Sequence, residues 1–446
     1  MRYDKAMVIQ EKNIKTLEDL RQHILGKVPS LYTSSKTSTV IPYDRIKEFI
    51  KSDNFFLVNL SGMPSQIQLK PNGNLVLSGA VSWLEAKNFL KNQGRDLKAS
   101  PTEELALVLA GVATSCTGER SFGFGPFRDH ILSLEYMDYQ GEVKELKSSQ
   151  KFTLSSLEKI SQYQKSYTPY LPFKNAPFPR LEKETDLLIG TEGQLGVVTK
   201  VEMSTCLWER QRYFFIKLPS WKKNDEAHLE IHQKVQKYRE AISAVEFTDE
   251  KSLNLLDPQD QITKEGDLLF LEVKSSYVEK IYDELFSKLT YIHEDQIFEI
   301  EKEKYHKVRS QIPRQVAEFI SHHKLLKLGT DTQFPVDKLH ELFAIYRKAS
   351  EVCLHHNLFG HFGDTHLHFN FLPQEKEVSK CQNWLENFYP QVLQAGGSPF
   401  AEHGIGILKQ KYIKHFYTSI QKDVFRELKQ KYDPYQQFFP QGYMHL

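Results

Sequence analysis

The sequence is poor in cysteine and lacks any apolar run long enough to cross a bilayer. Its four cysteines are far apart and have no CxxC spacing: Cys116, Cys206, Cys353 and Cys381. This argues against a disulfide framework or a cysteine-built metal cluster and favours a reducing compartment. The longest apolar run covers residues 105–116, whereas a membrane-spanning helix needs about 20 residues. The first residues, MRYDKAMVIQEKN, lack the apolar core of a signal peptide. We therefore expect a soluble cytoplasmic protein.

An excess of charge of either sign is also missing. The 446 residues include 58 Lys and Arg against 57 Asp and Glu, which makes the net charge +1. This balance gives no electrostatic basis for binding nucleic acid or an anionic membrane. Aromatic residues make up 12% of the chain, as is typical of ordered globular proteins, and the length suggests two or three domains.

The first two hundred residues alternate short apolar runs with turn signals. Residues 55–60 and 74–78 are predicted strands, and residues 82–92 repeat their apolar side chains at helical spacing. A second helix is predicted from 102 to 113, because the sequence Pro-Thr-Glu-Glu is a helix start signal. Residues 148–182 are rich in Ser, Lys, Pro and aromatics, and they predict a long irregular connection over the surface.

The pattern changes after Trp208, where a second domain is predicted to begin. Strands and helices are expected to alternate in the order β-α-β-β-α, at residues 213–218, 224–241, 244–247, 268–273 and 278–289. This is the split order of a ferredoxin-like sheet. We therefore expect an α+β fold with a domain boundary near residue 209.

The stretch GHFGDTHLHFNF, residues 360–371, gathers ligand-type side chains. In a strand over 365–371, His366, His368 and Asn370 would face one way, and three apolar side chains would face the core. His361 lies across a Gly-Asp turn and can fold back to meet His368. Two neutral imidazoles in a cavity suit a divalent ion such as zinc, manganese or iron. An ordinary solvated edge strand is the alternative, and the pattern alone leaves both open.

Three further segments carry weaker signals. Ala401-Glu402-His403-Gly404-Ile405-Gly406 offers a carboxylate ligand and a titratable base, although Glu-His pairs are common on surfaces. The segment 190–198, GTEGQLGVV, lets the backbone approach a flat or anionic group, or is simply a turn. The segment 113–118, ATSCTG, could cradle a pyrophosphate. The nearby Gly-Phe-Gly is followed by Pro126 and no helix start, which excludes a Rossmann nicotinamide site.

At these four motifs the sequence resembles the flavin-linked oxidases and dehydrogenases of the vanillyl-alcohol oxidase and p-cresol methylhydroxylase type. Within that superfamily it is similar to the D-2-hydroxy-acid branch, with D-lactate dehydrogenase, D-2-hydroxyglutarate dehydrogenase and the glycolate oxidase flavin subunit. The resemblance runs from about residue 50 to the C-terminus. It implies a two-subdomain FAD-binding domain (1–208), a ferredoxin-like cap carrying the substrate site (209–398) and a C-terminal segment (399–446) returning to the FAD domain.

The resemblance also implies roles for individual residues. His361, His368 and Glu402 would bind the metal, His403 would be the base, Asn370 would position substrate, and Arg309 would pair with the substrate carboxylate. The residues that would contact or shape the FAD pocket are Gly111, Thr114, Ser115, Gly118, Gly123, Gly190, Glu192, Gly196 and Val197. The expected reaction is oxidation of a D-lactate, D-2-hydroxyglutarate or glycolate type 2-hydroxy acid to the 2-oxo acid. The electron acceptor would be a quinone, an electron-transfer flavoprotein or oxygen.

The sequence departs from the family pattern at two places that bear on function. Residues 33–39, TSSKTST, stand where the family has a glycine-rich phosphate loop, and their Cβ atoms restrict positive φ angles. The hydroxyls and Lys36 of this segment can still bind phosphate. Thr365 and His366 replace the family's Gly and Asn, so His366 could add a metal ligand or alter the fit of the substrate.

Two rival functions stay open. One is a flavoenzyme of the same fold with other chemistry, of the alkyl-glycerone-phosphate synthase or sugar-lactone oxidase kind. The other is a non-catalytic subunit whose altered first loop no longer holds FAD. Whether two copies form a homodimer, and whether the protein lies against the inner membrane, also stay open.

Overall fold

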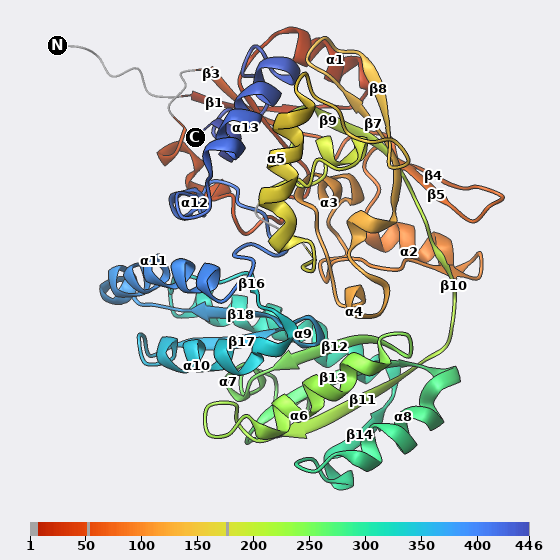
Figure 1. Ribbon diagram of the computed structural model, residues 1–446, viewed down its shortest axis with the longest axis vertical. Helices are drawn as coiled ribbons and strands as arrows, with labels where there is room; N and C mark the ends of the chain where they lie inside the picture. The colour runs from red at the N-terminus through yellow and green to blue at the C-terminus, as the bar shows by residue number, and fades with distance from the viewer. Residues whose placement is uncertain (1–7, 51–53, 175–177, 446) are drawn as a thin grey trace.

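The computed structural model describes residues 8–50, 54–174 and 178–445. Figure 1 shows two bodies, one built mainly from the N-terminal half of the chain and the other from residues after β10 (Cys206–Leu207). Strand β10 pairs with β6 (Arg95–Asp96) at the point where the chain passes from one body to the other.

The first body contains two sheets. A parallel sheet has the order β1-β3-β2, and an antiparallel sheet has the order β4-β5-β9-β7-β8. The strands are β1 (Val8–Asn13), β2 (Ser30–Thr33), β3 (Asn54–Asn59), β4 (Gln66–Leu69), β5 (Leu75–Ser78), β7 (Ile131–Met137), β8 (Val143–Lys147) and β9 (Val197–Met203). The two strands predicted in this part of the sequence are confirmed as β3 and β5.

The helices of this body differ in part from those predicted. They are α1 (Leu17–Leu25), α2 (Trp83–Lys91), α3 (Val108–Thr114), α4 (Ser121–Phe124) and α5 (Leu157–Tyr167). Helix α2 agrees with the prediction: Ser82 and Glu85 form a capping box, and Trp83, Ala86 and Leu90 are buried.

Two predictions in this region are wrong. The helix expected from residue 102 begins only at Val108, because the preceding residues pair with the start of α2: the Trp83 and Leu84 amides donate to the Ala106 and Glu104 carbonyls. The connection expected over 148–182 contains helix α5, whose Tyr163 is fully buried. Its aromatic residues therefore pack into the core instead of lying over the surface.

The second body is built on one large sheet with the order β14-β11-β13-β12-β17-β18-β15, in which β16 also pairs with β18. Its strands are β11 (Gln211–Leu218), β12 (Ile242–Thr248), β13 (Asp267–Lys274), β14 (Ile297–Ile300), β15 (Leu328–Gly329), β16 (Thr332–Gln333), β17 (His356–His361) and β18 (His366–Phe371). The order β14-β11-β13-β12 is that of a ferredoxin-like sheet, which confirms the predicted cap. Strands β17, β18, β15 and β16 extend it beyond β12.

The helices of the cap are divided between the two faces of this sheet. They are α6 (Glu226–Val235), α7 (Glu250–Leu253), α8 (Val278–Glu284), α9 (Lys302–His322), α10 (Leu339–Ala349) and α11 (Val378–Gln394). Tyr305 and Val308 of α9 pack with Phe215 and Phe270 on one face. Leu367, Phe369 and Phe371 of β18 join the main hydrophobic core with residues of α10 and α11 on the other.

The C-terminal residues return to the first body (Figure 1). Helix α13 (Ser419–Tyr432) follows the short α12 (Gln410–Ile413) and packs on α5, with the rings of Tyr163 and Phe425 6.0 Å apart. Beyond α13, Phe438 bridges to Ser30 of β2. The predicted return is thus confirmed, whereas the exact boundaries at 208/209 and 398/399 stay predictions. Among the described residues, no helix is both long and apolar enough to span a membrane.

Candidate active site

The β17–β18 hairpin carries the histidine-rich motif. His361 lies opposite His366, and Phe359 lies opposite His368. Because the side chains of a strand alternate, the buried apolar residues of β18 direct both of its histidines to the opposite face. Gly360 has a φ of +145°, and a Cβ there would lie 2.8 Å from the His366 carbonyl oxygen, so only glycine fits. The predicted alternation over this strand is therefore confirmed.

The aspartate of the motif anchors the hairpin turn and does not face the histidines. The Asp364 carboxylate lies 2.8 Å from Lys174 Nζ and 3.4 Å from Arg239 Nη1, and it accepts a hydrogen bond from the Ser121 hydroxyl. Asp364 and Lys174 are both buried. This cluster joins the cap turn to residues of the first body.

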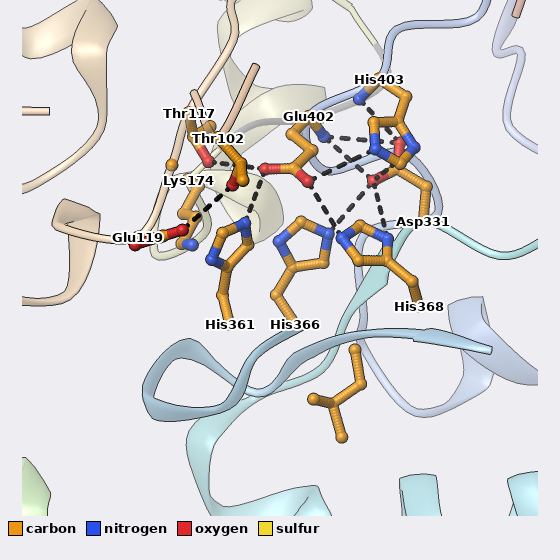
Figure 2. Close-up of polar contacts among 12 residues, drawn as sticks. Thr102, Thr117, Glu119, Lys174, Asp331, His361, His366, His368, Glu402 and His403 are labelled. Carbon is orange, nitrogen blue, oxygen red and sulfur yellow. Dashed lines mark hydrogen bonds and ion pairs between the residues drawn. The ribbon is translucent and has the colours of Figure 1, made fainter. Parts of the chain in front are cut away.

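Glu402 brings the predicted metal ligands together (Figure 2). Its Oε2 lies 3.0 Å from His361 Nε2, and its Oε1 lies 3.0 Å from His368 Nε2. The Thr117 hydroxyl also donates to Oε2 at 3.1 Å. Two histidines thus meet at the Glu402 carboxylate, although His361 and Glu402 are 41 positions apart in the sequence.

The donor atoms of this cluster fit a divalent ion. One ligand atom from each of His361, His366, His368 and Glu402 lies within 4.8 Å of the others. Ligands about 2.0–2.2 Å from one ion are themselves about 3–4 Å apart, so a small contraction would place them around a metal. His361 Nδ1 also lies 2.8 Å from Glu246 Oε1, a second contact that is typical of metal-binding histidines.

The charges of the cluster are strongly coupled. Burial lowers the pKa of His361, but the Glu246 and Glu402 carboxylates outweigh it and raise this pKa to about 9. Burial lowers the pKa of His366 to about 3 and also lowers that of His368. The imidazoles, His361 first, hold the pKa of Glu402 well below its usual range despite burial. The site therefore presents an ionised carboxylate and two neutral imidazoles at neutral pH.

Asp331, which the sequence analysis did not assign a role, organises the segment that carries Glu402 and His403. It is fully buried, and its carboxylate lies 2.8 Å from Lys409 Nζ and 3.1 Å from His366 Nε2. The backbone amides of Glu402 and His403 also donate to it, at 3.2 and 3.0 Å. In the sequence, the only indication of this role is that Asp331 is the single acid of the segment Lys-Leu-Gly-Thr-Asp.

We expect Asp331→Asn to destabilise the fold by about 3–5 kcal/mol, because the buried Lys409 ammonium loses its partner. Urea unfolding followed by circular dichroism measures this change. The matched control is Asp423→Asn, whose half-exposed carboxylate pairs with Arg426 and should change stability by about 0.5 kcal/mol or less. Equal effects of the two substitutions would contradict the role given to Asp331.

His403 is the most accessible member of the cluster. Its ring stacks on that of His368 with 4.8 Å between centroids and an interplanar angle of 18°. Its Nε2 lies 3.4 Å from Glu402 Oε1, and its Nδ1 lies 3.8 Å from Asp331 Oδ1. The side chain is 31% exposed, and it lines the cavity described below. An imidazole in this position can reach a ligand bound at Glu402 and take its proton.

The other two predicted catalytic residues, Arg309 and Asn370, differ in their position relative to the cavity. Arg309, on α9, lines the cavity, but its Nη2 lies 2.6 Å from Glu246 Oε2 and 3.5 Å from Glu119 Oε1. Asn370 donates to Asn357 Oδ1 at 2.9 Å, is 1% exposed and is not among the residues that line the cavity. The structure therefore brings Arg309 to the site but does not bring Asn370 there.

A cavity of about 840 Å³ extends from this cluster into the first body. Five of the nine residues predicted for the FAD pocket line it: Gly111, Thr114, Glu192, Gly196 and Val197. The other four, Ser115, Gly118, Gly123 and Gly190, do not line it. A Cβ on Gly118 would lie 1.7 Å from the Ser100 carbonyl oxygen, and one on Gly123 would lie 2.6 Å from that of Ile242. These two glycines allow close packing behind the cavity wall.

The altered phosphate loop lines the same cavity. Ser34 and residues 36–39 all face it. Lys36 has a φ of +53° although it is not glycine, so the chain adopts a positive φ that the Cβ atoms were expected to restrict. The segment thus has hydroxyl side chains and a lysine where the resemblance implies glycines, and the Lys36 ammonium lies 3.1 Å from Glu11 Oε1.

Glu192 links two of the predicted motifs. Its carboxylate accepts hydrogen bonds from the backbone amides of Ile405 and Gly406, at 2.5 and 3.0 Å. Segment 190–198 and segment 401–406 are therefore held side by side. Gly193, within the first of these segments, lines the cavity and has open space where a Cβ would be.

Comparison with known protein families shows the class of protein to which the chain belongs. Residues 208–441 match the C-terminal domain of FAD linked oxidases, and residues 36–147 match an FAD binding domain. The first match alone covers more than half of the 446 residues. The chain therefore belongs to the FAD-linked oxidase family.

Its relatives include dehydrogenases of 2-hydroxy acids. The chain is 22% identical over 384 residues to the mitochondrial D-lactate dehydrogenase [cytochrome] of Kluyveromyces lactis, covering 82% of this chain and 62% of that one. It is 25% identical over 395 residues to the mitochondrial D-2-hydroxyglutarate dehydrogenase of Danio rerio, covering 85% and 66%. The chain thus spans about three fifths of the length of the first of these relatives.

Among solved structures, alkyldihydroxyacetonephosphate synthase has a similar fold. The TM-score is 0.66 at 14% identity, and the match covers 96% of this chain and 76% of that one. This confirms the predicted fold of the p-cresol methylhydroxylase type.

Proposed function

We propose that this protein is an FAD-dependent dehydrogenase that oxidises a 2-hydroxy acid, of the D-lactate, D-2-hydroxyglutarate or glycolate type, to the 2-oxo acid with the help of a divalent metal. One observation carries the proposal: His361, His368, Glu402 and His403 converge on the same cavity that residues of the FAD binding domain line. The names of the relatives supply the substrate class.

Different residues of the chain would hold FAD and the metal. FAD would lie in the cavity along Gly111, Thr114, Gly196 and Val197, with residues 36–39 near its phosphates. His361, His368 and Glu402 would hold the metal. When bound, FAD supplies the hydride acceptor, and the metal supplies a Lewis acid that favours ionisation of the substrate hydroxyl.

The remaining residues position the substrate and move its proton. His403 accepts the hydroxyl proton on a ring nitrogen, and Asp331 holds the backbone of His403 in place. Arg309, on α9, provides the positive charge for the substrate carboxylate. Together these contacts would fix which face of the substrate carbon meets the flavin.

Purification tests the proposal against its rivals. The protein should be yellow, with about one FAD per chain, and should contain a divalent metal. Removal of the metal by a chelator should abolish reduction of the flavin by substrate, and added metal should restore it. A colourless protein that cannot take up FAD would favour a non-catalytic subunit. A yellow protein whose activity is indifferent to chelators would favour other chemistry on this fold.

Metal uptake near neutral pH is expected to release one proton. Metal-free His361 faces a carboxylate at each ring nitrogen, and its pKa is raised to about 9, so the ring is protonated below that pH. A metal at Nε2 displaces this proton, whereas Glu402 is already ionised and His368 already neutral. The apparent affinity should therefore rise with pH up to about 9 and then level off. Calorimetry of zinc binding in two buffers of different ionisation enthalpy measures the release; buffer-independent heats would contradict it.

A further inference from the structure

Arg309, the cation proposed to receive the substrate carboxylate, is already paired with two protein carboxylates. Its Nη2 lies 2.6 Å from Glu246 Oε2 and 3.5 Å from Glu119 Oε1. Its Nε is buried and has no hydrogen-bond acceptor within the described ranges. The N–H of the buried Nε is therefore unused, while both carboxylates approach the same nitrogen, Nη2.

An incoming carboxylate would meet like charge at this position. Arg309 lies between two carboxylates, and His361 pairs with one of them, Glu246, but not with Glu119. Like charges about 4 Å apart repel by several times the thermal energy even in the dielectric typical of a protein surface. To form two hydrogen bonds with Arg309, the substrate needs one of the glutamates to give way.

Glu246 is fixed, because its side chain is 1% exposed and its other oxygen lies 2.8 Å from His361 Nδ1. Glu119 is held less firmly. Its side chain is 19% exposed, its contact with Arg309 is the longer one, and it has another partner in the Thr102 hydroxyl, 3.3 Å away. Figure 2 shows Glu119 and Thr102 in contact beside the cluster. Of the two carboxylates, Glu119 is the one that can leave Arg309.

We propose that Glu119 is a specificity-determining residue that competes with the substrate carboxylate for Arg309. When a 2-hydroxy acid binds, Glu119 keeps its hydrogen bond to Thr102 and turns away from Arg309, which is left to the ligand. When no acid is bound, Glu119 adds a second negative charge beside Arg309, which Glu246 already pairs, and weakens the affinity of the site for carboxylates in general. The inference rests on the proposed function, since it requires a substrate that carries a carboxylate.

Binding of 2-oxo acids tests the role of Glu119, because the oxidised product does not reduce the flavin. Pyruvate and 2-oxoglutarate are titrated into oxidised, metal-loaded protein, and the change in flavin absorbance reports the Kd. Glu119→Gln should bind the better of the two acids about tenfold more tightly or more, because one repelling charge is removed. Thr102→Ala should act in the opposite direction, about two- to tenfold weaker, because Glu119 loses its alternative hydrogen bond.

Glu299→Gln is the matched control, because Glu299 also pairs with an arginine, Arg212, but on the outer strand of the cap sheet. Its Kd should equal that of the unaltered protein. Retained FAD and an unchanged Tm show that a variant is folded, and Glu119→Ala replaces Glu119→Gln if the latter is not. Binding that the Glu119 variant leaves unchanged or weakens would overturn the inference but not the proposed function. Failure of the unaltered protein and the variant to bind any 2-oxo acid would overturn both.

Discussion

Replacing His403 with alanine is expected to leave a yellow, metal-containing protein that its substrate reduces about 10²–10⁴-fold more slowly, the range typical of a lost general base. His403 is the cluster member best placed to take the hydroxyl proton, because its ring lies over His368 and is partly exposed to the cavity. Its loss leaves the ligand atoms of His361, His368 and Glu402 intact. Anaerobic stopped-flow absorbance of the flavin measures the rate of reduction directly.

The matched control for this experiment is His340→Ala. His340 is an exposed histidine of α10 that also faces a carboxylate, Asp225, at 3.1 Å. Its removal should leave the rate of flavin reduction unchanged. A His403→Ala protein that bleaches at the normal rate would exclude His403 as the base, and the proton would then have to leave through another group.

Replacing Glu402 with glutamine is expected to have an even larger effect. Glu402 contacts both His361 and His368, so its carboxylate joins the two proposed histidine ligands of the metal site. The amide lacks the negative charge with which a carboxylate binds a divalent ion more strongly. Lewis-acid stabilisation is worth several kcal/mol, and about 1.4 kcal/mol corresponds to a factor of ten, so we expect a rate loss of at least about 10³-fold. Metal content falls in parallel.

Metal analysis and stopped-flow kinetics on one preparation test this prediction. Glu386→Gln serves as the control, because Glu386 also lies beside a histidine, His415, at 3.2 Å, but away from the cavity. The Glu386→Gln protein should retain its metal, and its flavin should be reduced at the normal rate. Full metal content and normal flavin reduction in Glu402→Gln would contradict the assignment of the metal site.

The central site could be predicted from the sequence because its motifs are short and locally regular. Alternation along residues 365–371 separates polar from apolar side chains, and β18 follows it. The proximity of the His361 and His368 side chains also requires only a hairpin turn between the two strands. The arrival of Glu402 between them could not be derived from spacing, because it depends on tertiary contacts through Asp331 and Glu192. The family resemblance supplied that step.

Other features depended on tertiary contacts that leave little trace in the sequence. The helix start at Val108 is delayed because residues 104 and 106 bond to α2 instead. Glu246, a single acid within the apolar run Ala-Val-Glu-Phe, could have drawn attention, since a buried charge in a strand requires a partner. Its contacts with Arg309 and His361 explain it. They also show that Arg309 is not a free cation awaiting a ligand.

Anaerobic titration of the purified protein with D- and L-2-hydroxy acids, with metal analysis on the same sample, is the most direct measurement. The proposed enzyme predicts that one enantiomer of at least one acid bleaches the flavin completely, and only while the metal is present. A metal-loaded yellow protein that no 2-hydroxy acid bleaches, or one bleached equally well after its metal has been removed, would contradict the joint action of the flavin and the histidine–glutamate cluster.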